Sequence, residues 1–230
     1  MNLLYCFDTN YDKQTYISIM SFLEKNDCNL EIYIIHNDPS TFQKYLNKLN
    51  KFSNVNISIM RFKNEENVKL PIKRDDHVSE ATYYRLFIEK YLPKEIDHVL
   101  YVDSDVLCVR NIESPANRIF DELLNSDKII ASKVDGIQEG NEELFQNLNM
   151  DGSYFNAGVM FIDLVKWRTN GLSQKLFSKL RSLEGKITFW DQDVLNSFFN
   201  GNYLEVSDHF NFYISDKTKK ADFEKILETL

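Results

Sequence analysis

Two aspartates follow a short apolar segment in the middle of the chain. Residues 98–102 read His-Val-Leu-Tyr-Val, and Asp103 and Asp105 come directly after them. Such a run is typical of a buried strand, and open α/β sheets bind ligands at the carboxyl ends of their strands. Because side chains two residues apart on an extended chain point the same way, both carboxylates can reach one cation. Hard divalent cations prefer oxygen ligands, so the pair indicates a site for Mn²⁺ or Mg²⁺.

The overall charge of the chain bears on this cation. The sequence has 27 Lys and Arg against 35 Asp and Glu, a net charge of -8, with no basic stripe. A nucleotide diphosphate would be repelled by two carboxylates in such a protein unless a metal ion neutralised them. The same charge balance argues against nucleic acid as a partner. A surface turn with two solvated acids is the alternative interpretation of Asp103 and Asp105.

A second polar group follows the first apolar segment, residues 3–7. Asp8, Asn10 and Tyr11 offer an acceptor, an amide and an aromatic ring at an expected strand-to-helix turn. Such a set can pair with the edge of a base and stack on its face. The alternative is local, with Asp8 or Asn10 capping the next helix and Tyr11 packing against it.

Acidic and amide residues also open a helical segment near the end of the sequence. Residues 190–199 have the pattern of a helix, and Asp191, Gln192 and Asp193 lie in its first turn. Helix capping and compensation of the helix dipole are one explanation for the two aspartates. Gln192 has no capping role, so it stands out as a candidate functional residue.

Two further sites carry polar residues in apolar surroundings. Arg85 lies one position off the apolar face of an expected helix, so it is either a solvated charge or an anion clamp. Asn156 and Gly158 interrupt an apolar strand over residues 154–162. An amide and a glycine in such a strand suggest the close approach of a ligand or of another backbone.

The elements that must position these residues alternate along the chain. Apolar or alternating runs predict strands over residues 3–7, 30–35, 55–62, 98–102, 128–132 and 154–162. Helical spacing predicts helices around residues 16–23, 42–49, 84–91 and 190–199, and Ser114-Pro115 predicts the N-cap and first-turn proline of another. The βαβαβ opening argues for an α/β fold, with a mostly parallel central sheet and helices on both faces. A length of 230 residues fits a single domain.

Cysteine use and hydropathy bear on the compartment. Cys6, Cys28 and Cys108 have neither metal-ligand nor redox spacing, so we expect reduced, buried thiols. The first residues carry no basic leader, and no apolar run approaches the roughly 18 residues of a membrane helix. We therefore expect a cytoplasmic protein without a transmembrane segment, with peripheral attachment at the inner membrane face as a further option.

Six segments in order carry a family resemblance. They read FDTNY, ATYYRLF, VLYVDSDVLCV, YFNAGVMFIDLVKWR, WDQDVLN and HFNF, and they span residues 3 to about 213. Together they resemble glycosyltransferase family 8, the retaining nucleotide-sugar enzymes typified by bacterial lipopolysaccharide galactosyltransferases and by glycogenin. The resemblance implies a GT-A fold and one nucleotide-sugar-binding domain over residues 1–230. The family usually has a later His-x-x-Gly-x-x-Lys-Pro-Trp closing stretch, which these residues lack.

The resemblance assigns the candidate residues to parts of one nucleotide-sugar site. It implies that Asp103 and Asp105 are the metal-binding DxD pair that holds Mn²⁺ against the donor diphosphate, with Asp103 also near the ribose. The residues that match the uridine-binding turn are Asp8, Asn10 and Tyr11. Those that match positions around the transferred sugar are Arg85, Asp191 and Gln192. Those similar to positions on the sugar and acceptor side are Asn156, Asp135 and His77.

The implied reaction is metal-dependent, retaining transfer of a hexose, glucose or galactose. The donor is a UDP-sugar, and the acceptor is the hydroxyl of a glycan, a lipid-linked molecule or a protein. One alternative is a haloacid-dehalogenase-type phosphohydrolase, with Asp103 as nucleophile and Asp105 as acid and base. The other is a non-catalytic UDP-sugar-binding module, which the missing closing stretch would explain.

Overall fold

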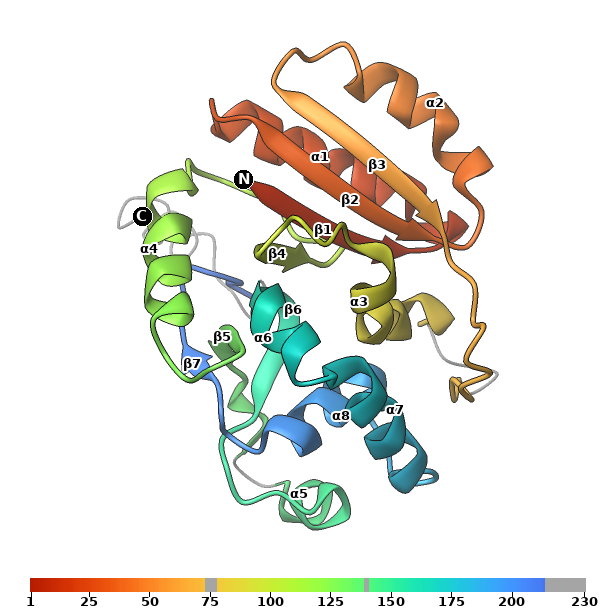
Figure 1. Cartoon of the computed structure of the whole chain (residues 1–230), viewed down its shortest axis with the longest axis vertical. Helices are drawn as coiled ribbons and strands as arrows, with labels where there is room; N and C mark the ends of the chain where they lie inside the picture. The colour runs from red at the N-terminus through yellow and green to blue at the C-terminus, as the bar shows by residue number, and fades with distance from the viewer. Residues whose placement is uncertain (73–77, 139–140, 214–230) are drawn as a thin grey trace.

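A seven-stranded sheet forms the centre of the molecule in a computed structural model that describes residues 1–72, 78–138 and 141–213 (Figure 1). Its strands are β1 (Asn2–Phe7), β2 (Leu30–His36), β3 (Val55–Arg61), β4 (His98–Val102), β5 (Ile130–Val134), β6 (Phe155–Asp163) and β7 (Leu204–Glu205). They lie in the order β3-β2-β1-β4-β6-β5-β7. The predicted strands are confirmed to within two residues. The apolar runs form buried strands, whereas the alternating run over residues 55–62 forms β3, whose residues are half-buried or exposed.

One strand, β6, runs opposite to the other six strands of the sheet. The pairs β1–β2, β2–β3, β1–β4 and β5–β7 are parallel, as the βαβαβ opening predicts. Strand β6 runs antiparallel to both of its neighbours, β4 and β5. Its amino-terminal residues therefore lie beside the carboxyl end of β4, where Val102 pairs with Val159. This reversal brings the Asn156–Gly158 region next to Asp103.

Helices cover both faces of the sheet, which confirms the predicted layers (Figure 1). One face packs against α1 (Asp12–Lys25), α2 (Pro39–Leu49) and α4 (Glu113–Leu124). The other face packs against the 3-10 helix η2 (Glu80–Phe87) and α3 (Ile88–Tyr91), α5 (Glu142–Leu148), α6 (Leu164–Thr169), α7 (Leu172–Ser182) and α8 (Trp190–Phe199). Short 3-10 turns, η1 (Thr9–Tyr11) and η3 (Gly136–Gln138), follow β1 and β5.

Two local predictions differ from the structure. The first half of the helix expected around residues 84–91 belongs to the 3-10 helix η2, and only the second half, Ile88–Tyr91, is α-helical. Ser114 is not the N-cap of α4, which begins one residue earlier, at Glu113. The side chain of Asn111 accepts a hydrogen bond from the Glu113 N–H at 3.0 Å, so this asparagine satisfies the start of the helix instead.

The cysteines are free thiols, as expected. Cys6 and Cys108 are buried and Cys28 is half-buried, and none of the three forms a disulfide within the described ranges. Across the same part of the chain, every helix is too short or too polar to span a lipid bilayer.

Candidate active site

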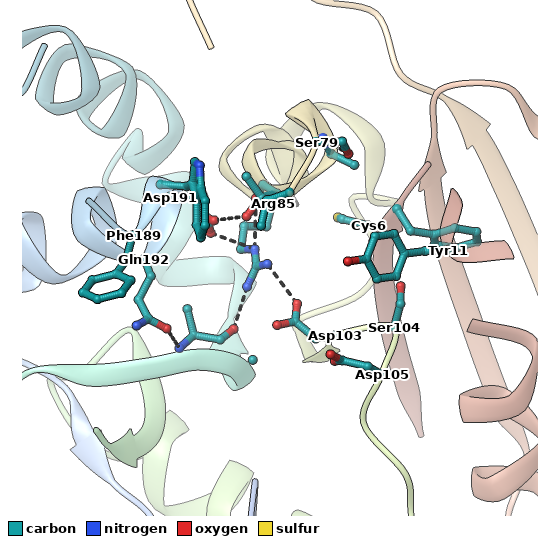
Figure 2. Close-up of a pocket in the computed structure, with 17 residues that line it drawn as sticks. Cys6, Tyr11, Ser79, Arg85, Asp103, Ser104, Asp105, Phe189, Asp191 and Gln192 are labelled. Carbon is teal, nitrogen blue, oxygen red and sulfur yellow. Dashed lines mark hydrogen bonds and ion pairs between the residues drawn. The ribbon is translucent and has the colours of Figure 1, made fainter. Parts of the chain in front are cut away.

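A cavity of about 280 Å³ opens at the carboxyl ends of β1 and β4. Its walls come from five segments that lie far apart in the sequence: the end of β1 with η1, the helix η2, the turn after β4, the start of β6 and the start of α8. Of the predicted site residues, those that line it are Tyr11, Arg85, Asp103, Asp105, Asp191 and Gln192. In Figure 2, Arg85 lies between Asp191 and Asp103, and Tyr11 and Asp105 lie across the cavity from Gln192.

Arg85 is buried at the centre of this cavity wall and contacts two carboxylates. Its Nη2 lies 2.9 Å from Asp103 Oδ1, and its Nε lies 2.9 Å from Asp191 Oδ2. Nη1 donates a hydrogen bond of 2.7 Å to the Ala157 carbonyl, and the guanidinium lies 4.1 Å from the centroid of the Tyr101 ring. Burial alone would lower the pKa of Arg85, but the two aspartates outweigh it and hold the pKa above its usual value. Arg85 is therefore not a solvated charge.

The 3-10 geometry of η2 explains how Arg85 reaches the site. Residues three apart lie above one another on a 3-10 helix, so Thr82 and Arg85 share one side of η2. The Thr82 hydroxyl donates a hydrogen bond to Asp191 Oδ1. Sequence analysis missed Thr82, because the partner that gives it a place in the site, Asp191, lies 109 residues away.

Asp191 presents a buried carboxylate oxygen to the cavity. Its Oδ2 lies near Arg85 Nε, but that N–H is directed toward the Thr82 carbonyl, so Oδ2 accepts no hydrogen bond of good geometry. Burial raises the pKa of Asp191 to about 6, against the opposing effect of Arg85. The helix-capping interpretation does not hold for Asp191, because no side chain caps the start of α8. Asp193 instead accepts hydrogen bonds from the Thr188 and Phe189 N–H groups, which precede the helix.

Helix α8 is joined to β6 by two side-chain amides. Gln192 Oε1 accepts a hydrogen bond of 2.8 Å from the Ala157 N–H. One turn later, Asn196 Oδ1 accepts from the Phe155 N–H at 2.7 Å, and its Nδ2 donates to the Phe155 carbonyl at 2.8 Å. These amides satisfy the backbone of β6 where a neighbouring strand would otherwise do so. The side-chain carbonyl of Gln192 is thereby held in one orientation at the cavity wall.

The two aspartates after β4 lie on a turn and not on an extended chain. The Val106 N–H donates to the Asp103 carbonyl at 3.2 Å, and both carboxylates still line the cavity. Asp103 Oδ1 accepts hydrogen bonds from the Tyr101 hydroxyl at 2.6 Å and from Arg85, while Asp105 is exposed. Ser104, between them, instead bonds Thr15 of α1 at 2.8 Å. Within the described ranges, no group of three His, Cys, Asp or Glu side chains could hold a metal ion.

The turn after β1 contributes its aromatic residue to the cavity. Tyr11 lines the cavity, whereas Asp8 and Asn10 do not. Asp8 is buried and caps η1, because its Oδ1 accepts a hydrogen bond of 2.9 Å from the Asn10 N–H. The local interpretation of Asp8 is therefore realised in this structure, and the side chain of Asn10 is exposed.

The predicted sugar and acceptor residues lie beside the cavity. Asn156 Nδ2 donates a hydrogen bond of 3.0 Å to Asp135 Oδ2, which joins the start of β6 to the end of β5. Both side chains are half-buried. His77 lies outside the described residues.

Comparison with known proteins gives one consistent result. The family model described as glycosyl transferase family 8 matches residues 2–229. Lipopolysaccharide 1,2-glucosyltransferase of Escherichia coli (strain K12) is 31% identical over 229 residues, which cover 96% of this chain and 65% of the relative. Lipopolysaccharide 1,3-galactosyltransferase of Salmonella typhimurium is 29% identical over 221 residues, which cover 93% of this chain and 64% of the relative. The chain therefore spans about 65% of the length of these curated relatives.

A solved structure agrees with the sequence comparisons. The crystal structure of the galactosyltransferase LgtC in complex with donor and acceptor sugar analogs superimposes with a TM-score of 0.77 at 25% identity. The match covers 92% of this chain and 75% of that one. This likeness confirms the predicted GT-A fold.

Proposed function

Because the chain belongs to glycosyltransferase family 8, we propose that it transfers a hexose, glucose or galactose, from a UDP-sugar to an acceptor hydroxyl with retention at the anomeric carbon. The observation that carries the proposal is the pair of contacts made by Arg85. This one buried residue joins Asp103, on the metal side of the cavity, to Asp191, on the sugar side. A donor in this cavity would therefore meet both carboxylates at a fixed separation.

Asp103 and Asp105 are the residues that would hold Mn²⁺, with Mg²⁺ as the alternative. Their carboxylates are oxygen donors of the kind that both ions prefer, and Asp103 Oδ1 is already fixed by Arg85 and Tyr101. When bound, the ion supplies Lewis-acid stabilisation of the negative charge on the departing diphosphate.

The nucleotide would bind at the β1 side of the cavity. Tyr11 presents an aromatic ring on which uracil can stack. Asp8 and Asn10 form the turn that holds this ring, with the Tyr11 N–H donating to the Asp8 carbonyl at 2.9 Å. Asp103, between this turn and the sugar side, would contact the ribose.

The sugar would bind between Arg85 and the start of α8. Asp191 Oδ2, a buried oxygen without a well-directed donor, can accept a hydrogen bond from a sugar hydroxyl. Gln192 is the residue that would face the anomeric carbon, and a neutral amide is a poor nucleophile. We therefore expect a front-face path with oxocarbenium character and no stable covalent intermediate. Asn156, Asp135 and His77 would line the sugar and acceptor side.

The acceptor we propose is a glycan, a lipid-linked molecule or a protein, within bacterial glycan or lipopolysaccharide synthesis. Both lipopolysaccharide transferases compared above support this class. The phosphohydrolase alternative loses its basis, because the chain belongs to glycosyltransferase family 8. A non-catalytic UDP-sugar-binding module is the outcome to be separated by experiment.

A thermal-shift panel tests the proposal. UDP, GDP, UDP-glucose and UDP-galactose are each added with and without Mn²⁺. We expect UDP and one UDP-sugar with Mn²⁺ to raise the melting temperature by about 5 °C or more at a hundredfold excess over Kd, because binding then adds about 2.7 kcal/mol. Asp105→Asn should abolish the Mn²⁺-dependent part of the shift, whereas the exposed Asp27→Asn should not.

Three outcomes separate the candidates. A rise in melting temperature, together with release of UDP from the donor in the presence of acceptor or water, supports the transferase. A shift without any turnover supports the binding module. If no uridine nucleotide shifts the melting temperature more than GDP does, the proposed donor class is wrong.

A further inference from the structure

Asn211 reaches the edge of the candidate site from the segment that follows β7. Its backbone is left-handed, with φ +76°, a conformation that asparagine tolerates better than most residues. The preceding residue, Phe210, packs edge-on against Phe161, with ring centroids 5.1 Å apart. Lys133 Nζ also lies 3.4 Å from the Asn211 carbonyl oxygen. The position of Asn211 is therefore supported from β5 and β6.

The side chain of Asn211 fixes the amide of Asn156. Asn211 Nδ2 donates a hydrogen bond of 2.7 Å to Asn156 Oδ1, and the Gly158 N–H donates to the same oxygen at 2.9 Å. Because a carbonyl oxygen has two lone pairs, both acceptor positions are taken. Asn156 Nδ2 in turn donates to Asp135 Oδ2 at 3.0 Å. Flipping the Asn156 amide would disrupt all three bonds, so its orientation is determined.

This arrangement leaves one donor of Asn156 for a ligand. An amide nitrogen has two N–H groups, and one of them bonds Asp135. Among the residues that the structure describes, the other N–H has no acceptor. Asn156 is half-buried and directly precedes Ala157 and Gly158, which line the cavity.

Gly158 keeps the space between Asn211 and the metal-side carboxylate open. A Cβ on Gly158 would lie 3.1 Å from Asp103 Oδ2, 3.3 Å from Asn211 Nδ2 and 3.0 Å from Asn156 Oδ1. All three polar atoms therefore surround the position that a side chain at residue 158 would occupy. Glycine in a strand often marks such a place, where a ligand or another backbone comes close.

We propose that Asn211 is a positioning residue for the donor sugar. It holds Asn156 Oδ1, so that the remaining N–H of Asn156 is directed to a sugar hydroxyl. The inference rests on the proposed function, since it assigns a role within the same donor site. Asn211 acts through Asn156 and need not touch the sugar. Asparagine suits this position for two reasons: it tolerates the left-handed backbone, and its side-chain amide supplies the donor.

Binding measurements with Asn211→Gly test the proposal. Glycine keeps the left-handed backbone and removes only the amide. Calorimetry with Mn²⁺ would compare UDP with whichever of UDP-glucose and UDP-galactose the wild type binds more tightly. We expect the affinity for UDP to stay within about twofold and the affinity for the UDP-sugar to fall about tenfold, the effect of one lost hydrogen bond. The matched control is Asn149→Gly, at an exposed left-handed asparagine (φ +53°) that ends α5, and it should change neither.

A double-mutant cycle shows whether Asn211 acts through Asn156. In an Asn156→Ala background, Asn211→Gly should cause no further loss of UDP-sugar affinity. Additive losses, equal losses for UDP and UDP-sugar, or no loss at all would each overturn the inference. If Asn211→Gly does not fold, Asn211→Asp replaces it, because its carboxylate keeps the shape and repels Asn156 Oδ1. A wild-type chain that binds no uridine nucleotide would refute the proposed function itself, which keeps the two failures distinct.

Discussion

Asp193 accepts a hydrogen bond of 2.6 Å from the hydroxyl of Tyr154, and neither side chain is exposed to solvent. The other carboxylate oxygen of Asp193 accepts from the Thr188 N–H at 2.6 Å and the Phe189 N–H at 2.8 Å. One buried acid therefore shapes the turn that leads into α8. That turn includes Trp190, whose φ of +46° is unusual for a bulky residue. Asp191 and Gln192 follow it immediately.

Replacing Asp193 should therefore damage both stability and the site. Asp193→Ala would leave the buried Tyr154 hydroxyl and the part-buried N–H groups of Thr188 and Phe189 without their acceptor. We expect the free energy of unfolding to fall by about 2–4 kcal/mol, measured by urea denaturation. The exposed control Asp27→Ala should stay within about 0.5 kcal/mol of the wild type. Equal stability of Asp193→Ala and wild type would contradict the role of Asp193 as the acceptor for these groups.

Removing Arg85 should leave the repulsion between Asp103 and Asp191 uncompensated. Arg85→Met leaves Asp103 and Asp191 without their shared cation, so we expect a loss of about 3–5 kcal/mol at pH 8. Because protonation removes the uncompensated negative charge, the loss should be smaller at pH 5. Urea denaturation at the two pH values measures the difference. A loss that is the same at both would show that packing, and not charge, dominates.

The raised pKa of Asp191 gives stability a predictable dependence on pH. The folded-state pKa is about 6, against an ordinary value of 3.8, so the folded protein binds more protons than the unfolded chain between these values. This contribution is fully present below about pH 4 and is lost as the pH rises through about 6. The stability of the wild type relative to Asp191→Asn should therefore fall by about 1–3 kcal/mol from pH 4 to pH 7. Parallel stability profiles for the two proteins would refute the assignment.

Replacement by alanine should be more harmful at Gly158 than at a glycine whose Cα faces open space. In Gly158→Ala the new Cβ lies within 3.3 Å of three polar side-chain atoms, which must each move by a few tenths of an ångström. We expect donor affinity to fall about tenfold or more while stability changes by about 1 kcal/mol. Gly136→Ala is the matched control, because nothing lies within 4 Å of its Cβ. Calorimetry with a UDP-sugar would register the difference, and unchanged affinity in Gly158→Ala would show that no ligand approaches there.

Gln192 should matter more for transfer than for nucleotide binding. Gln192→Ala removes the carbonyl that is held against the Ala157 N–H. We expect UDP affinity to change less than twofold and the rate of transfer to fall by about 10²-fold, since an electrostatic contact at the reacting carbon stabilises only the transition state. Radiolabelled donor assays give the rate. Transfer at the wild-type rate would remove Gln192 from the mechanism.

Local patterns predicted the elements that carry the site, but not how those elements meet. The apolar run before Asp103 forms β4, and residues 190–199 form α8 as predicted. The direction of β6 has no local signal, because a strand buried on both faces has the same hydrophobic pattern in either direction.

The sequence also did not indicate which residues far apart in the chain contact one another. Whether Arg85 was solvated or buried depended on Asp103 and Asp191, which lie 18 and 106 residues away. Thr82 was missed because its partner, Asp191, lies 109 residues away. Asn211 lies in the segment HFNF, but its hydrogen-bond partner, Asn156, is 55 residues away in the sequence.

The reversed strand β6 also bears on how such a protein can diversify. The chain leaves the sheet after Val134 and returns to it at Phe155, the residue that pairs with Val134. The intervening residues 135–154 can therefore change in length without shifting β5 or β6. Helix α5 and the turn η3 belong to this stretch. That stretch can be exchanged as a unit while Ala157 and Gly158, the residues of β6 that line the cavity, keep their places.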